Sequence, residues 1–388
     1  MSSDSKSLSL PVVDCRSCPK AGPSHGLRLN PSKAKVLTDL GGTVQGQIAA
    51  CLALKHQLQS GVDVIHLPPF VASPSKGSPR RAEGVILYRD KFTEDAVAQT
   101  IARHSGSAGI AARLKAVDPT ASDGGGALYS AGRVLAGEAF TRGDNFFLFG
   151  PDVFMLESTT TGNHMSFEFL SASEALLAGV VTKIQTVFGP KAAADWGAVI
   201  NPSTAPFTVA GAATAHETGH KALPVRVIPE RDERTSGLST FMFDTLGELA
   251  ADAVGNAVYG EVFGPRLPMY THFYRIFGYS SMAFDLSGIH GANADNDALA
   301  GAISWSFMEA TGGITYHAGE FQLDLSRCAP AWAAILKELT KFLNSLVQLP
   351  KDSQDAAARA WVSKYVPCDA AGRYAFPTTM ALAFHTSK

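Results

Sequence analysis

The chain has 388 residues, 46% of them hydrophobic, which is enough for two domains or for one large domain with a substantial core. Its 33 basic and 35 acidic side chains leave a formal net charge of -2. A basic surface for nucleic acid or for an anionic membrane is therefore not expected, and neither is an acidic solvating tail.

Residues 1–30 are rich in Ser, Pro, Gly and Lys and are expected to be a poorly ordered leader. The first ten residues lack the apolar segment of a secretory signal, and no run of about 18 apolar residues predicts a membrane span. The C-x-x-C pair Cys15 and Cys18 lacks the second half that a structural zinc site needs. Because the sequence shows neither a secretory signal nor a membrane span, we expect a cytoplasmic protein.

Residues 31–200 alternate between helical and strand patterns, which is typical of a mixed α/β domain. Helical patterns begin near Ser32 and cover 93–104 and 171–188, and strand patterns cover 62–67, 84–88, 146–149 and 153–156. Thr93 is the expected N-cap of the second helix, and Gly189-Pro190 the expected end of the third. The segment 106–126 is rich in Gly, Ala, Ser and Asp, so we expect a loop there.

Residues 201–388 are expected to form a mainly helical, zinc-binding catalytic domain. Helical patterns cover residues 206–222, 240–259, 296–310 and 330–347. The sequence therefore predicts an α+β fold, with a mixed α/β N-terminal half and a mainly helical C-terminal half that carries the zinc site.

The predicted helix 206–222 contains the pattern H-E-x-x-H at His216, Glu217 and His220. Residues four apart lie on the same face of a helix, so both imidazoles can reach one metal ion. Glu217 reaches the same side, where it can take a proton from a water molecule at the metal. The alternative is a pair of histidines in a partly buried helix, satisfied by hydrogen bonds to neighbouring groups.

A second acidic pattern, Glu248 and Asp252, lies in the predicted helix 240–259. If this helix crosses the first, Glu248 can be the third ligand of a His₂Glu zinc site with an open position for water. Asp252, one turn later, can accept the free ring N–H of a ligand histidine and fix its orientation. The alternative is a T-x-x-E capping box from Thr245 to Glu248, with Asp252 facing solvent.

Together the two patterns resemble the gluzincin metallopeptidases, and among them the dipeptidyl peptidase III family. In that family a glycine precedes the last histidine, as Gly219 does here. Its glutamate helix reads like E-x-R-A-E-S-V-G, and residues 248–255 of this chain read E-L-A-A-D-A-V-G. The resemblance covers residues 205–260.

The resemblance implies a zinc enzyme with His216, His220 and Glu248 as the metal ligands and Glu217 as the base. The family differs from this chain in having three residues, rather than two, between the histidines. Its members are also far longer, with two lobes around a peptide cleft. Asn296 and Ala300 stand where the family has a histidine and an arginine that contact substrate.

A zinc hydrolase or lyase also needs a donor for the oxyanion or enolate that develops during the reaction. His290 lies in a glycine-flanked loop, and Tyr316 and His317 follow a Gly-Gly turn, so these three are candidate catalytic residues. Further candidates are His272, Tyr270, Tyr274 and Tyr279. Most of them belong to an aromatic cluster, which either lines a pocket or is part of the core.

The connector between the two metal helices is charged. The run 230–234 is typical of a solvated loop, whereas Arg226, close to the zinc helix, can bind a substrate carboxylate.

The sequence thus predicts a zinc-dependent, metallopeptidase-like hydrolase that acts on a peptide or amide bond of a small molecule or short peptide. Glu217 serves as the general base and returns the proton to the leaving group. A first alternative is a zinc-dependent lyase, isomerase or cyclase that acts on a small carbonyl-containing metabolite, with Glu217 as acid and base. A second is a non-catalytic binding protein with a relic metal site, which the intact Glu217 argues against.

Overall fold

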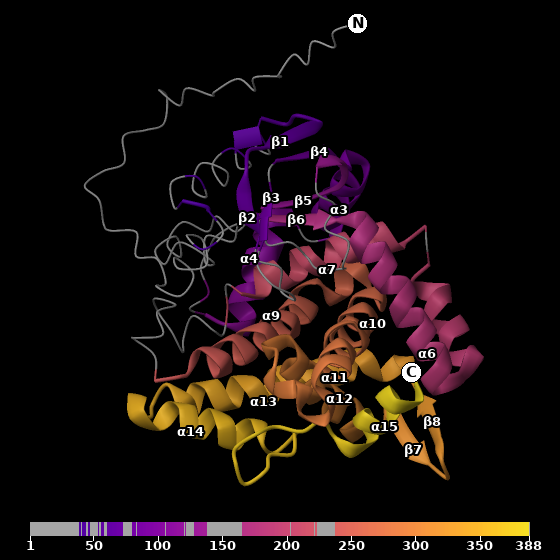
Figure 1. Cartoon of the computed structure of the whole chain (residues 1–388), viewed down its shortest axis with the longest axis vertical. Helices are drawn as coiled ribbons and strands as arrows, with labels where there is room; N and C mark the ends of the chain where they lie inside the picture. The colour runs from indigo at the N-terminus through magenta and orange to yellow at the C-terminus, as the bar shows by residue number, and fades with distance from the viewer. Residues whose placement is uncertain are drawn as a thin grey trace, which may run out of the picture.

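The structure is a computed structural model that describes residues 60–72, 80–82, 84–104, 106–119, 128–137, 165–201, 203–220 and 237–387, with a few further positions: 39, 41–43, 46, 53, 56–57, 121 and 222. Over these residues the chain is mainly helical, with a small sheet at one end, which agrees with the expected α+β class (Figure 1). Several predictions fall outside the described residues: the leader, the C-x-x-C pair, most of the helix near Ser32, the strands 146–149 and 153–156, Arg226 and the run 230–234.

The sheet has four strands in the order β1-β4-β5-β6. Their bounds are β1 Val64–Leu67, β4 Val85–Arg89, β5 Leu128–Gly137 and β6 Met165–Phe169. The first three pair antiparallel, whereas β6 runs parallel to β5. The strands predicted at 62–67 and 84–88 are confirmed as β1 and β4, and their partners Ile65 and Leu87 are fully buried.

Two strand pairs lie outside this sheet. They are β2 Phe70–Ala72 with β3 Arg80–Ala82, and β7 Ile314–His317 with β8 Glu320–Leu323.

Two helices, α3 Lys91–His104 and α4 Gly106–Val117, correct the sequence-based expectations. Asp90 rather than Thr93 caps α3, because the Asp90 carboxylate accepts a hydrogen bond from the backbone N–H of Thr93 at 3.1 Å. The loop expected from residue 106 is wrong over α4. Ile110 and Leu114, one turn apart on this helix, are both buried in the core, and their burial outweighs the low helix propensity of the glycines.

Helix α6 Leu170–Val199 contains a kink at Gly189, where φ is 84° and ψ is 170°. Pro190 begins the second helical segment, where its fixed φ and its missing N–H are tolerated. The predicted helix end at Gly189-Pro190 therefore holds for the first segment only.

The second half is built from helices, as expected. They are α7 Ala205–Gly219, α9 Thr240–Phe263, α10 Arg266–Phe273, the π-helix η2 Tyr274–Ser280, α11 Ser281–Ser287, the 3₁₀-helix η3 Gly288–Asn293, α12 Asn296–Ala310, the 3₁₀-helix η4 Leu325–Arg327, α13 Cys328–Leu346, α14 Lys351–Val362 and α15 Thr378–Thr386. The four predicted helices are present as α7, α9, α12 and α13. None of the described helices combines the length and apolarity that a membrane crossing requires.

One hydrophobic core joins both halves, with members such as Val97, Ile184 and Val254. Helix α7 lies at its centre beside α9 (Figure 1). Most α7 residues are small and buried, so the two helices approach closely. A Cβ added to Gly255 of α9 would lie 2.6 Å from the carbonyl oxygen of Ala215 in α7. This close contact brings the polar residues of the two helices together.

Candidate metal centre

His216 and His220 lie on one face of α7, as their spacing predicts. Pro206 occupies the first turn of this helix, where its missing N–H has no helical partner to lose. The Nε2 atoms of the two histidines are 3.0 Å apart, and the rings meet edge to face with centroids 4.5 Å apart. Two ring nitrogens this close need a proton or a cation between them, because their lone pairs would otherwise repel.

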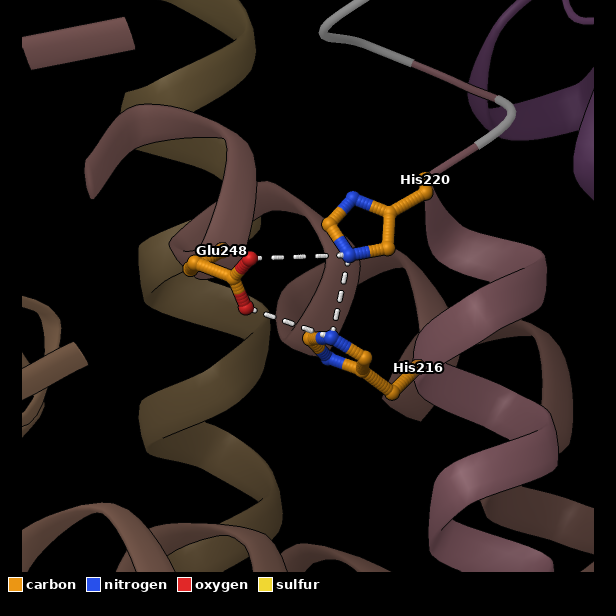
Figure 2. A group of neighbouring side chains, drawn as sticks. All are labelled: His216, His220 and Glu248. Carbon is orange, nitrogen blue, oxygen red and sulfur yellow. Dashed lines mark hydrogen bonds and ion pairs between the residues drawn. The ribbon is translucent and has the colours of Figure 1, made fainter. Parts of the chain in front are cut away.

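Glu248 reaches the same point from α9 (Figure 2). Its Oε2 lies 3.2 Å from His216 Nε2, and its Oε1 lies 3.8 Å from His220 Nε2. The capping-box alternative is wrong, because α9 begins at Thr240 and Thr245 lies inside the helix. Its hydroxyl donates to the carbonyl oxygen of Phe241 instead.

These three side chains form a group that could hold a metal ion, with all ligand atoms within 4.8 Å of one another. Zinc binds imidazole nitrogen at about 2.0–2.1 Å and carboxylate oxygen at about 2.0–2.2 Å, so two ligand atoms at tetrahedral angles lie about 3.3 Å apart. Here the two Nε2 atoms are 3.0 Å apart, His216 Nε2 lies 3.2 Å from Glu248 Oε2, and His220 Nε2 lies 3.8 Å from the other oxygen, Oε1. The donor set therefore fits a zinc ion in both chemistry and spacing.

Asp252 lies behind His216, one turn along α9 from Glu248. Its Oδ1 is 2.8 Å from His216 Nδ1, so the carboxylate accepts the Nδ1–H and leaves Nε2 facing Glu248 and His220. This contact fixes the tautomer and the orientation of the ring, as the carboxylate partners of metal-binding histidines do.

The electrostatics of the group depend on these buried neighbours. Burial lowers the pKa of His216, but Asp252 and Glu248 outweigh this effect and raise the pKa to about 10. Burial raises the pKa of Glu248, but the hydrogen bond with His216 and the charges of His220, His216 and Arg275 hold it well below its usual range. Glu248 is therefore ionised at neutral pH, which metal binding requires.

Glu217 follows His216 on α7 and is almost fully buried, with 3% of its surface exposed. An acidic side chain is rarely buried to this extent unless it has a partner or a chemical role.

A pocket of about 60 Å³ lies beside His216 and Glu248. Helix α7 contributes the apolar residues Val209, Ala212 and Ala213 to its lining, which also includes Tyr270, Tyr274, Tyr279, Arg275 and Asp297. Tyr270, Tyr274 and Tyr279 thus meet both expectations, because they line the pocket and are also buried in the hydrophobic core.

The π-helix η2 explains how the tyrosines reach this pocket. In a π-helix, residues five apart lie above one another. Tyr274 and Tyr279 are such a pair, and their hydroxyl oxygens are 3.0 Å apart. Arg275 lies over the ring of Tyr279, with its central carbon 5.5 Å from the ring centroid. Arg275 and Asp297 were not predicted as site residues, and the sequence offers no signal for the π-helix that presents the arginine.

Glu217 is not among the residues that line this pocket, and neither are the other predicted catalytic residues. Tyr316 and His317 are exposed on β7, which Figure 1 shows at the far end of the molecule from α7. Their role in the site is corrected, because the Gly-Gly turn directs them into an outer hairpin. His290 lies in η3, where its Nδ1 is 3.4 Å from the carbonyl oxygen of Tyr374.

His272 is a core residue rather than a donor to the pocket. It stacks on Trp332, with centroids 4.3 Å apart, and it bonds to Ser304 Oγ and to the carbonyl oxygen of Cys328. Burial lowers its pKa to about 3, against weaker raising effects of the Cys328 carbonyl and Asp252, so the ring is neutral.

No known protein family and no curated protein matches the sequence. Solved structures with a similar fold include two dipeptidyl-peptidases III. Dipeptidyl-peptidase III from Caldithrix abyssi is similar with a TM-score of 0.50 and 9% identity, over 84% of this chain and 58% of that one. Dipeptidyl-peptidase III from Corallococcus sp. strain EGB is similar with a TM-score of 0.51 and 12% identity, over 86% of this chain and 63% of that one. The chain thus spans about three fifths of their length, and the likeness is one of fold.

Proposed function

We propose that this protein is a zinc-dependent hydrolase that cleaves a peptide or amide bond. The observation that carries the proposal is the convergence of His216, His220 and Glu248, whose ligand atoms are 3.0 to 3.8 Å apart. The fold shared with two dipeptidyl-peptidase III structures supports a peptidase-like chemistry.

In this proposal His216, His220 and Glu248 hold the zinc. When bound, zinc would supply Lewis-acid chemistry by polarising a carbonyl and making a water molecule more acidic. Glu217 takes the proton of the attacking water and gives it to the leaving amine. Asp252 accepts the Nδ1–H of His216 and so favours the tautomer whose Nε2 lone pair can bind a metal. The hydroxyls of Tyr274 and Tyr279, which line the pocket, are candidate donors to a developing oxyanion.

A second candidate keeps the metal and changes the reaction to that of a lyase, isomerase or cyclase. The small pocket favours this candidate, because about 60 Å³ admits only a few atoms of a substrate. Glu217 would then move a proton beside a carbonyl instead of activating water.

The test begins with the metal content of the purified full chain. We expect about one zinc per chain in the wild type and in Glu217→Gln, and loss of zinc in His216→Ala. His104→Ala, which changes an exposed histidine of α3, is the matched control and should keep its zinc. A wild type without zinc, or equal zinc in His216→Ala, would overturn the proposal.

Incubation with a diverse peptide mixture, followed by mass spectrometry, then separates the two reactions. Cleavage by the wild type that disappears in Glu217→Gln supports hydrolysis. No cleavage of any peptide by a zinc-loaded wild type would leave the lyase, isomerase or cyclase as the better candidate.

A further inference from the structure

Arg275 lies at the base of the pocket and bonds to three carboxylates. Its Nη2 donates to Glu248 Oε2 at 3.1 Å, and its Nε donates to Asp252 Oδ2 at 2.5 Å. Its Nη1 donates to Asp297 Oδ1. The arginine comes from η2, while the carboxylates come from α9 and α12. Its side chain is only 6% exposed.

Stability alone is a weak reason for this arrangement. Removing a guanidinium and three carboxylates from water is costly, and well-packed apolar residues of similar volume are often at least as stabilising. A guanidinium stays protonated in proteins, so Arg275 remains charged among these carboxylates. A charged group kept here against its desolvation cost points to a role at the metal centre.

The contacts of Arg275 show what that role can be. Oε2 of Glu248, which Arg275 holds, is also the oxygen that lies 3.2 Å from His216 Nε2. A glutamate carboxylate rotates easily about its last bond, so a free one can approach a cation with one oxygen or with both. The hydrogen bond from Arg275 restricts this rotation.

Arg275 also acts on His216 through Asp252. The two oxygens of Asp252 are divided, with Oδ1 on His216 Nδ1 and Oδ2 on Arg275 Nε. A single guanidinium thus orients Glu248 directly and His216 through the shared carboxylate, and its Nη2 also lies 3.3 Å from His216 Nδ1.

We propose that Arg275 is the positioning residue of the metal centre, an inference that rests on the metal site proposed above. It fixes the rotation of the Glu248 carboxylate through Oε2 and holds His216 through Asp252.

The test uses the full chain and the metals alone, with zinc for affinity and Co²⁺ as a spectroscopic probe of ligand number. Arg275→Lys keeps the positive charge but replaces the planar, forked guanidinium by a compact ammonium, so the three carboxylate contacts cannot keep their present geometry. We expect its zinc affinity, measured by competition with a chelating dye, to fall about 10–100-fold. We also expect weaker visible absorption of its Co²⁺ form, because a released Glu248 can bind with both oxygens and raise the coordination number.

Arg113→Gln is the matched control. Arg113 also pairs with α9, through Glu261 Oε2 at 2.7 Å and the Val258 carbonyl at 3.2 Å, about 15–20 Å along the helix from Glu248. It should keep the wild-type affinity and spectrum. Arg275→Gln leaves three carboxylates without their cation and can fail to fold, in which case Arg275→Lys decides.

A merely structural arginine would lower the melting temperature of Arg275→Lys and leave both metal readouts at their wild-type values. That result overturns the inference while the proposed function stands. A wild type that binds neither metal overturns both.

Discussion

Gly219 of α7 lies directly against the backbone of Ala251 in α9. A Cβ added to this glycine would be 2.0 Å from the carbonyl oxygen of Ala251, far closer than real atoms approach. Gly219 precedes His220, and Ala251 precedes Asp252. The contact therefore sets the distance between the two helices at the level of the metal-binding group.

This contact predicts that Gly219→Ala will damage the metal site. The added methyl group meets backbone, which cannot move aside as a flexible side chain can, so α7 and α9 must separate. Overpacking of this kind costs about 1–3 kcal/mol of stability. We expect a lower unfolding midpoint in urea and loss of zinc at metal concentrations that saturate the wild type.

Gly260→Ala is the control for this substitution, since a Cβ at that position of α9 meets nothing within 4 Å. It should stabilise the helix by up to about 1 kcal/mol and retain zinc. Equal zinc binding by Gly219→Ala and Gly260→Ala would show that the spacing of the helices does not control the site.

Much of the candidate site follows from local patterns in the sequence. His216 and His220 share a face because of helical spacing alone, and Glu248 stands out as an acidic residue in an alanine-rich helix. The small residues of α7 and α9 that allow close packing are also visible in the sequence, although their contacts are not. Long helices such as α9 and α13 were predictable because their patterns extend over several turns.

The rest depends on tertiary contacts that no local pattern encodes. Helix α4 forms in a glycine-containing segment because Ile110 and Leu114 find a core to enter. Arg275 looks like an ordinary charged residue until η2 places it among three carboxylates. A π-helix shifts side chains relative to α-helical spacing, so the face that Tyr274 and Tyr279 share could not be derived from a period of 3.6 residues.

Asp252→Asn should weaken metal binding without removing a ligand. An amide carries no charge and can turn its NH₂ group toward His216 Nδ1, so it no longer favours the tautomer with a free Nε2 lone pair. We expect zinc affinity to fall about 10–100-fold in a chelator competition assay. Asp195→Asn removes only an exposed pair with Lys191 and should leave the affinity at the wild-type value.

His272 predicts a loss of stability in acid that does not depend on the metal. Burial lowers its pKa to about 3 in the folded chain, against about 6.5 when unfolded. Between these values the unfolded chain binds a proton that the folded chain does not. The His272 contribution to stability is therefore complete above about pH 6.5 and falls by about 1.4 kcal/mol per pH unit below it.

Urea unfolding with EDTA, measured from pH 8 to pH 4.5, checks this prediction. His272→Gln has a side chain that is neutral over this whole range. Below pH 6.5 its free energy of unfolding should fall less steeply than that of the wild type, and above pH 6.5 the two curves should be parallel. Parallel curves over the whole range would show that His272 does not contribute to acid unfolding.

The hydroxyls of Tyr274 and Tyr279 test the chemistry of the pocket. One of the two O–H groups must donate to the other, because their oxygens are 3.0 Å apart, and this pairing holds both at the pocket wall. If a phenol donates to a developing oxyanion, Tyr279→Phe should lower kcat for peptide cleavage about 10²–10³-fold. Zinc content should stay the same, since neither tyrosine belongs to the ligand group.

Tyr365→Phe, outside the pocket, should keep the wild-type kcat. If the hydrogen bond between the two hydroxyls only stabilises the fold, Tyr279→Phe will instead cost about 1 kcal/mol of stability and leave kcat unchanged.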